Sequence, residues 1–190
     1  MFLFDLPKGS LISLYGFCSK KVADLLALSA VSKGWRCLLL VPRIPEIGTK
    51  GLKGKIGELI LLEVLEIGGL FRILEQQKLI QGLDLIVLNS LESYLETEDL
   101  TPREASLVSA LLRKLRVTAN SNELIAIVAS EAKSKKLKLM LKWWSKTTIE
   151  LSDLGVRDHV LAIVHSKGER KMIELKLGRK LKQVGLFSFT

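Results

Sequence analysis

The segment that decides the fold spans residues 11–23, with the sequence LISLYGFCSKKVA. It opens with a short apolar run that ends at Gly16, and this pattern predicts a buried strand. From Ser19 to Lys33 the apolar residues recur at helical spacing, and Gly34 follows where a glycine commonly ends a helix. A strand, a glycine-containing turn and a helix in this order are the setting of a phosphate-binding loop.

This turn lacks the residues with which such a loop binds phosphate. A working loop has the spacing Gly-x-x-x-x-Gly-Lys-Ser/Thr, in which backbone amides cradle the phosphates, the lysine neutralises charge and the hydroxyl holds Mg²⁺. Counted from Gly16, the second glycine is replaced by Lys21, the lysine by Val22 and the hydroxyl residue by Ala23. A shifted frame that uses Lys20 or Lys21 still lacks the preceding glycine and the following hydroxyl. The turn alone predicts at most a weak phosphate site.

Strands and helices alternate along the rest of the chain. We expect strands at 35–41, 70–74, 84–88, 124–129, 147–151, 160–164 and 171–177, the last two joined by a Ser-Lys-Gly-Glu hairpin turn. We expect helices at 56–67 and after Thr101-Pro102, where proline suits the first turn. This order predicts one α/β domain over residues 1–190, with a mostly parallel sheet flanked by helices and a C-terminal antiparallel hairpin.

Several segments, taken in order, resemble the RecA/RadA recombinase family. Residues 6–9 (LPKG) are similar to the Pro-x-Gly turn before the family's phosphate-binding loop. Residues 84–90 (DLIVLNS) resemble its Walker B strand, residues 125–131 (IAIVASE) the strand that ends in the γ-phosphate sensor, and residues 141–151 (LKWWSKTTIEL) the segment beyond. The resemblance covers nearly the whole chain. It implies a RecA-like core without the family's N-terminal DNA-binding domain, as in short core-only paralogues.

The family's nucleotide chemistry is missing from the matching positions. The Walker B aspartate is Asn89, and the sensor pair is Ser130-Glu131. Mg²⁺ prefers carboxylate and hydroxyl ligands, and phosphoryl transfer depends almost entirely on positioning and electrostatics. We therefore expect no ATPase activity, no catalytic residues, no cofactor and no metal. The family's protomer-linking Phe-x-x-Ala motif is also absent from the sequence.

Composition excludes several other classes of protein. The chain has 190 residues, of which 48% are hydrophobic, a composition typical of globular proteins. Cys18 and Cys37 are too few for a disulfide scaffold, and we expect them, with His159 and His165, to be structural. No apolar run reaches the length of a membrane span, and the first residues lack the features of a signal peptide. We expect a soluble, cytoplasmic protein without a membrane partner.

The net charge of +9 is concentrated in two segments. Residues 131–146 contain six lysines and one glutamate, and residues 165–182 contain seven lysines or arginines and two glutamates. The rest of the chain is close to neutral. Such a distribution favours a localised anionic partner, nucleic acid above all, while the alternative is two solvated faces that keep the protein soluble.

The first basic segment falls where the resemblance places the family's second DNA-contacting loop. The expected phosphate contacts are Lys133, Lys135, Lys136, Lys138, Lys142 and Lys146. The same segment also fits an amphipathic helix whose apolar face, with Leu137 and Leu141, lies against the core. Trp143 and Trp144 match a packed Phe-Tyr pair of the family, which favours their burial over stacking on bases.

These observations favour one function and leave others open. We expect a non-catalytic recombinase paralogue that binds single-stranded DNA, a RecA/RadA-type recombinase or another paralogue, and assists homologous recombination and DNA repair. A first alternative is a nucleotide-free RecA-fold scaffold subunit of a protein complex or an RNA-modifying complex. A second is an interaction module that uses residues 92–104, an acidic segment of the wrong sign for DNA.

Overall fold

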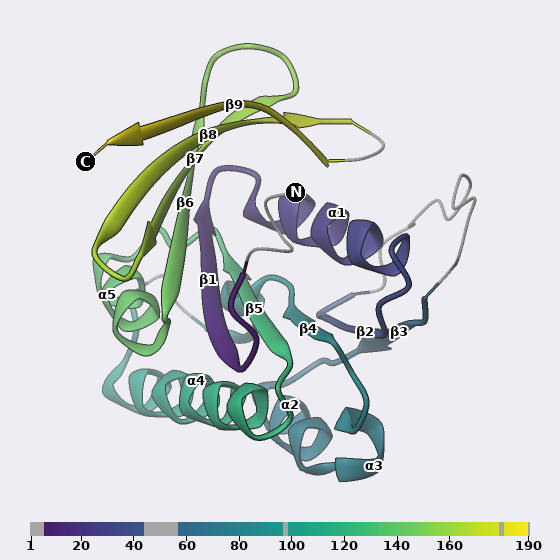
Figure 1. The fold of residues 1–190 in the computed structure, drawn as a ribbon. Helices are drawn as coiled ribbons and strands as arrows, with labels where there is room; N and C mark the ends of the chain where they lie inside the picture. Colours follow the sequence, from purple (N-terminus) through teal and green to yellow (C-terminus); the bar gives the residue numbers. More distant parts are fainter. Residues whose placement is uncertain (1–5, 44–56, 97–98, 179–180, 190) are drawn as a thin grey trace.

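In the computed structural model, the nine strands of the described residues form one sheet with the order β3-β2-β4-β5-β1-β6-β7-β8-β9 (Figure 1). The structure describes residues 6–43, 57–96, 99–178 and 181–189. The strands are β1 (Ser10–Gly16), β2 (Cys37–Val41), β3 (Leu59–Glu63), β4 (Leu85–Leu88), β5 (Ile125–Ser130), β6 (Thr147–Asp153), β7 (His159–Ser166), β8 (Glu169–Leu177) and β9 (Leu181–Phe189). The helices are α1 (Ser19–Val31), α2 (Ile67–Glu75), α3 (Gln77–Ile80), α4 (Pro102–Ser121) and α5 (Lys135–Trp144), with a 3₁₀ helix, η1 (Leu91–Tyr94).

The sheet has a parallel half and an antiparallel half. All pairs from β3 to β6 are parallel, whereas β6, β7, β8 and β9 pair antiparallel. The predicted α/β class, with a mostly parallel sheet and an antiparallel C-terminal part, is confirmed. In the parallel half the central strands are buried on both faces, which explains their uninterrupted apolar runs.

Helices cover the two faces of the sheet and create two separate cores (Figure 1). Alternate residues of each strand belong to different cores, because successive side chains point to opposite faces. In β1, Ile12 and Leu14 pack with α1, whereas Leu11 and Tyr15 pack with α2, α4 and α5. The antiparallel strands add their apolar residues to the α1 side, and β9 lies against α1 (Figure 1).

The start of α4 follows the prediction from Thr101-Pro102. The Thr101 hydroxyl accepts a hydrogen bond from the Glu104 amide at 3.2 Å, and the Glu104 carboxylate accepts one from the Thr101 amide at 2.9 Å. This reciprocal pair is a capping box, and it satisfies two amides that the helix itself leaves without partners. No helix in the described ranges is long and apolar enough to cross a membrane.

Two predicted elements are wrong. Residues 59–63, predicted as part of a helix over 56–67, form β3, which pairs in parallel with β2 (Ile56 lies outside the described residues). Residues 70–74, predicted as a strand, lie in α2, which buries Leu70 and Leu74 at helical spacing. Short apolar runs fit either structure, and here pairing with β2 and packing against the second core decide between them.

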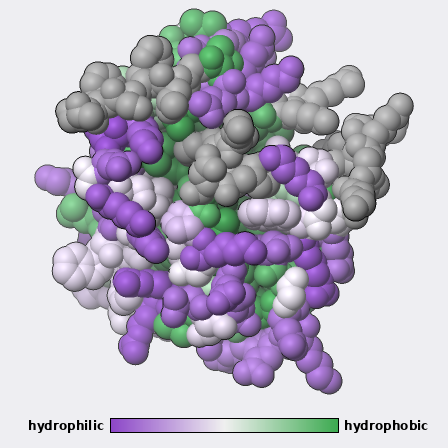
Figure 2. Space-filling view, in the orientation of Figure 1, coloured by the Kyte–Doolittle hydropathy of each residue, from purple (hydrophilic) through white to green (hydrophobic). Residues whose placement is uncertain are grey.

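The visible surface is mostly hydrophilic. Figure 2 shows hydrophobic side chains reaching this face only in small patches between hydrophilic ones. Scattered apolar groups of this kind are normal for a globular protein.

Candidate functional site

The sheet order brings together, at one edge, the positions that match the family's nucleotide-binding motifs. Strands β4, β5 and β1 are parallel neighbours, so Asn89, Ser130 and Gly16 all lie at their carboxyl ends. Ligands of open α/β sheets bind outside this edge. The positions that resemble the Walker A and Walker B motifs thus lie at the same end of the parallel strands.

The turn from β1 to α1 is short. Only Phe17 and Cys18 lie between the two elements, whereas a working loop has four residues between its glycines. The Phe17 amide donates to the Leu151 carbonyl at 3.1 Å, so it points back into the sheet. Gly16 is required here: its φ is 101°, and a Cβ would lie 2.4 Å from the same carbonyl oxygen.

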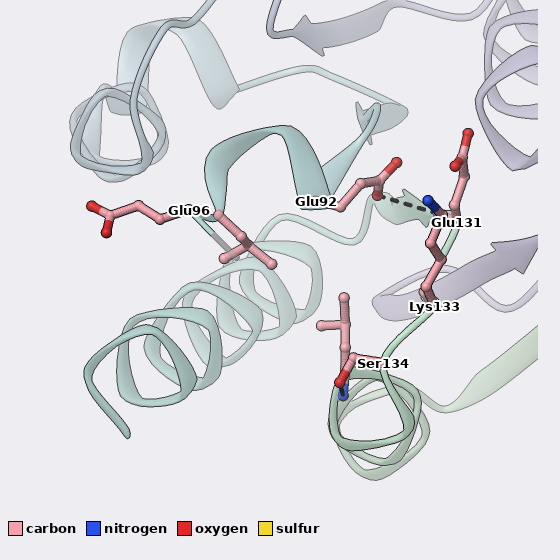
Figure 3. A pocket seen from close by; sticks show the side chains of 8 residues that line it. Glu92, Glu96, Glu131, Lys133 and Ser134 are labelled. Atoms are coloured by element: carbon pink, nitrogen blue, oxygen red, sulfur yellow. Dashed lines mark hydrogen bonds between the residues drawn. The ribbon is translucent and has the colours of Figure 1, made fainter. Parts of the chain in front are cut away.

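Lys20 is paired within the protein. Its Nζ lies 3.1 Å from Glu92 Oε1 and 3.7 Å from Glu131 Oε1. The Glu131 amide in turn donates to Glu92 Oε2 at 3.2 Å (Figure 3). Glu92 belongs to η1, after β4, and Glu131 directly follows β5, so three segments meet in one ion cluster. The cation that a shifted phosphate-binding frame would use is therefore already neutralised by carboxylates.

The other altered positions have structural partners. Lys21 Nζ lies 3.5 Å from Asp158 Oδ1, on the loop between β6 and β7. Val22 and Ala23 stand at the positions of the family's lysine and hydroxyl residue. Both belong to α1, and their side chains are buried in the core between α1 and the sheet. Within the described ranges, no group of three His, Cys, Asp or Glu residues is arranged to hold a metal ion.

Asn89 has a partner that the sequence did not suggest. Its Nδ2 donates to Asp24 Oδ1 at 2.6 Å and lies 3.4 Å from the Lys20 carbonyl oxygen. Burial raises the pKa of the Asp24 carboxyl, while the hydrogen bond from Asn89 lowers it. A carboxylate at position 89 would face a second carboxylate, so the amide is the side chain that Asp24 requires. In the sequence, the only sign of this contact is that Asp24 is the single acidic residue between Ser19 and Val31.

A small acidic pocket lies next to the ion cluster (Figure 3). It has a volume of about 250 Å³ and lies between η1 and the start of α5. Glu92, Glu96 and Glu131 line it together with Lys133, and Figure 3 shows Glu96 pointing away from the other two glutamates. Because carboxylates predominate, its field opposes a polyphosphate.

The predicted DNA-binding lysines do not form one cluster. Lys133 lies at the acidic pocket, and Lys136 Nζ donates to the Leu100 carbonyl at 3.1 Å. Along α5, Lys135, Lys138 and Lys142 follow one another at spacings of three and four residues and therefore share a face, beside the buried Leu137 and Leu141. Lys146 is exposed just before β6. The alternative of an amphipathic helix is therefore realised, with the lysine face beside the apolar face and the Lys142 Nζ 5.8 Å from the centroid of the buried Tyr15 ring.

The expectation that both neighbouring tryptophans are buried is wrong for one of them. Trp144 is half-buried, and its Nε1 donates to Ser109 Oγ of α4 at 3.1 Å. Trp143 is 81% exposed. Adjacent helical residues differ by about 100° in direction, so only one of the pair can face α4.

The remaining predicted structural residues have ordinary surroundings. His159 Nδ1 lies 2.6 Å from Glu174 Oε1 on the neighbouring strand, a cross-strand pair that the sequence did not indicate. Cys37 is buried in the core, and this burial raises the pKa of its thiol to about 12, whereas Cys18 is half-buried at the start of α1. Both cysteines are free. None of these residues takes part in the ion cluster of Lys20, Glu92 and Glu131.

Comparison with known proteins identifies the fold. No protein-family model and no curated protein match the sequence. The crystal structure of the RadB recombinase matches with a TM-score of 0.74 and 16% identity, over 94% of this chain and 92% of that one. The flagellar accessory protein FlaH from Methanocaldococcus jannaschii matches with a TM-score of 0.62 and 13% identity, over 94% and 91%. The chain therefore has the RecA-like fold, and the resemblance seen in the sequence is confirmed at this level.

Proposed function

We propose that this chain is an accessory protein with a RecA-like fold that does not hydrolyse ATP. In this proposal it binds single-stranded DNA, a catalytic RecA/RadA-type recombinase, or both, and assists homologous recombination and DNA repair. Its mechanism is mass action, because a protein that binds only one state of a filament stabilises that state.

The carboxyl edge supports the absence of ATP hydrolysis. The short β1–α1 turn, the pairing of Lys20 with Glu92 and Glu131, and the Asn89–Asp24 hydrogen bond together occupy the nucleotide positions with internal contacts. Phosphoryl transfer needs a cation and a Mg²⁺ site in those positions. We therefore expect isothermal titration calorimetry with Mg·ATP to detect no stoichiometric heat of binding, and a Mg²⁺-dependent one-to-one signal would contradict this part of the proposal.

The observation that carries DNA binding is the lysine face of α5. Lys135, Lys138 and Lys142 lie along one side of the helix, and none of them has an ion pair among the described residues. The Lys142 Nζ lies 5.8 Å from the centroid of the buried Tyr15 ring, so Lys135 and Lys138 are the members of this face without a cation–π contact to the core. Lysines of this kind contact phosphates without selecting bases. The helix directly follows β5, the position of the second DNA-contacting segment in the family that the chain resembles. The fold of the RadB recombinase is consistent with this assignment.

The test is a charge reversal of this face. We expect the triple variant K135E/K138E/K142E to lose most of its affinity for fluorescently labelled oligo(dT), measured by anisotropy, and its melting curve to stay unchanged. Each lysine–phosphate contact on a single strand contributes about 0.7 to the slope of log affinity against log salt, so the slope should fall by about 2.

A matched variant separates local contact from net charge. Lys167→Glu, Arg170→Glu and Lys176→Glu remove the same charge from exposed positions of β8 and of the turn that precedes it. We expect this control to bind oligo(dT) more tightly than the α5 variant, with an almost unchanged salt slope. Equal losses in the two variants would show that only net charge matters and would refute the lysine face.

A second candidate function is a scaffold subunit without a role in DNA binding. The exposed Phe17 and Val156 line a cleft of about 300 Å³ beside the β1–α1 turn, and exposed apolar side chains that gather at one place favour a protein partner. The similarity to FlaH, described as an accessory protein, is consistent with this role. Affinity capture from native extract, with and without nuclease, distinguishes the two functions. A nuclease-resistant partner that is lost in Phe17→Ser, together with no oligo(dT) binding, would favour the scaffold.

A further inference from the structure

A second surface feature lies at the opposite edge of the parallel sheet. A groove of about 720 Å³ is bounded by the start of β1, the second half of α4, the end of α5 and the residues just before β6. These are the amino ends of β1 and β6, which are parallel neighbours. The groove is therefore separate from the carboxyl edge, where the degenerate nucleotide motifs lie.

The groove is basic and lacks acidic residues. Arg113, Arg116 and Lys146 line it, and no aspartate or glutamate does. All three side chains are exposed, and none is paired with a carboxylate among the described residues. The acidic pocket at the other edge has three glutamates and one lysine. The two edges of the same sheet thus present opposite charge.

The wall contributed by α4 is a single helical face. Arg113, Arg116, Val117 and Asn120 are spaced by three, one and three residues, which places them along one side of the helix. All four are exposed, so this face is not used for packing in the core. The C-terminal end of a helix carries partial negative charge, so an anion is better placed at Arg113 and Arg116 than at Asn120.

The opposite wall presents the indole of Trp143. The residue is 81% exposed, whereas its neighbour Trp144 is tied to α4 by the hydrogen bond to Ser109. This hydrogen bond fixes the end of α5 and therefore the direction of Trp143. Burying an aromatic ring is strongly favourable, and nothing in the described part of the chain covers this one.

We propose that this groove binds single-stranded nucleic acid, with one base stacked on Trp143 and the flanking phosphates at Arg113 and Arg116. An unpaired aromatic ring beside unpaired guanidinium groups is the combination that binds single strands, because every base has a flat face and every linkage a negative charge. The polar groove suits a phosphate backbone better than an apolar peptide. The inference rests on the proposed function because both name single-stranded nucleic acid as the ligand, but the groove uses residues outside the lysine face of α5.

The two sites are connected by one helix. Helix α5 has ten residues, a length of about 15 Å, and it runs from the carboxyl end of β5 to the amino end of β6. A single-stranded nucleic acid that follows the lysine face along this helix would reach the groove at Trp143. The lysines would then supply affinity through phosphates, and the groove would hold one base in place.

The test compares two oligomers of equal length, oligo(dT) and an abasic chain that has phosphates but no bases. We expect Trp143→Ala to weaken binding of oligo(dT) about 5- to 100-fold and to leave the abasic chain unchanged. Trp143→Phe should retain most of the affinity because a ring remains. Leu139→Ala removes another exposed apolar residue of α5 and serves as the matched control, for which we expect no change.

The arginines should act on both oligomers. Arg113→Ala with Arg116→Ala should weaken oligo(dT) and abasic binding alike and lower the salt slope by about 1.4. Repeating the titrations with oligo(U) distinguishes RNA from DNA, and a Trp143-dependent loss with either polymer supports the groove. Unchanged oligo(dT) binding by Trp143→Ala would refute it. So would an equal loss with the abasic chain, or binding of polyglutamate as tight as that of oligo(dT).

The outcomes for the two sites are separable. If K135E/K138E/K142E loses binding and Trp143→Ala does not, the groove is refuted and the lysine face stands. If Trp143→Ala loses binding and the lysine variant does not, the lysine face is refuted and the groove stands.

Discussion

Asn89→Asp restores the side chain expected at the end of a Walker B strand, and we expect it to destabilise this protein at neutral pH. Asn89 is buried, and its Nδ2 lies 2.6 Å from Asp24 Oδ1. The new carboxylate would face the carboxyl of Asp24 across this contact. Like charges at this distance cannot both remain ionised without a large cost.

Two estimates limit the size of the effect. If both carboxylates stay ionised and move apart to about 4 Å, their repulsion at an effective dielectric constant of about 20 costs about 4 kcal/mol. If one takes up a proton instead, holding it at pH 7 costs about 4 kcal/mol, because the reference pKa is about 3.9 and each unit is worth about 1.4 kcal/mol. We therefore expect the free energy of unfolding to fall by up to about 4 kcal/mol at pH 7.

The loss should depend on pH in a defined direction. In the folded variant the carboxyl pair holds its proton more tightly than the unfolded chain does, so the folded pKa is raised. Such a group contributes full stability below the unfolded value of about 3.9 and loses it as pH rises through the folded pKa. The difference between variant and wild type should thus be small near pH 4.5 and largest at pH 7 and above.

Urea unfolding followed by circular dichroism, at pH 4.5 and at pH 7, measures this difference. The control is the double variant Asn89→Asp with Asp24→Asn, which exchanges the amide and the carboxyl and should recover most of the stability. A loss of equal size at both pH values, or no recovery in the double variant, would show that the reasoning from charge is wrong.

Three further predictions concern the stability of the folded protein. Asp24→Asn alone should make the protein slightly more stable at pH 7 and no more stable at low pH, because burial raises the pKa of this carboxyl and its ionisation opposes folding; chemical denaturation at the two pH values tests this. Gly16→Ala should lower the free energy of unfolding by more than 2 kcal/mol in urea, since φ is 101° and the added Cβ would contact the Leu151 carbonyl oxygen, and a variant as stable as wild type would contradict the geometry. Thr101→Ala should cost about 1 kcal/mol in the same assay through loss of the capping box at α4, whereas Thr101→Ser should cost much less.

Local patterns in the sequence determined the class of fold and the absence of the phosphate-binding motif after Gly16. The apolar runs of β1, β2, β4 and β5, the glycine after α1 and the Thr101-Pro102 start of α4 each depend on neighbours within a few residues, so they could be predicted. The same holds for the replacement of the Walker residues by Lys21, Val22, Ala23 and Asn89.

Only the tertiary structure decided what depends on contacts between distant segments. The run at 59–63 became a strand because β2 offers it a partner, and residues 70–74 became a helix because the second core receives Leu70 and Leu74. The pairing of Lys20 with Glu92 and Glu131, and of Asn89 with Asp24, joins side chains 65 to 111 positions apart in the numbering. The exposure of Trp143 follows from the anchoring of Trp144 on α4. No local pattern encodes such contacts, because chain topology sets which elements become neighbours.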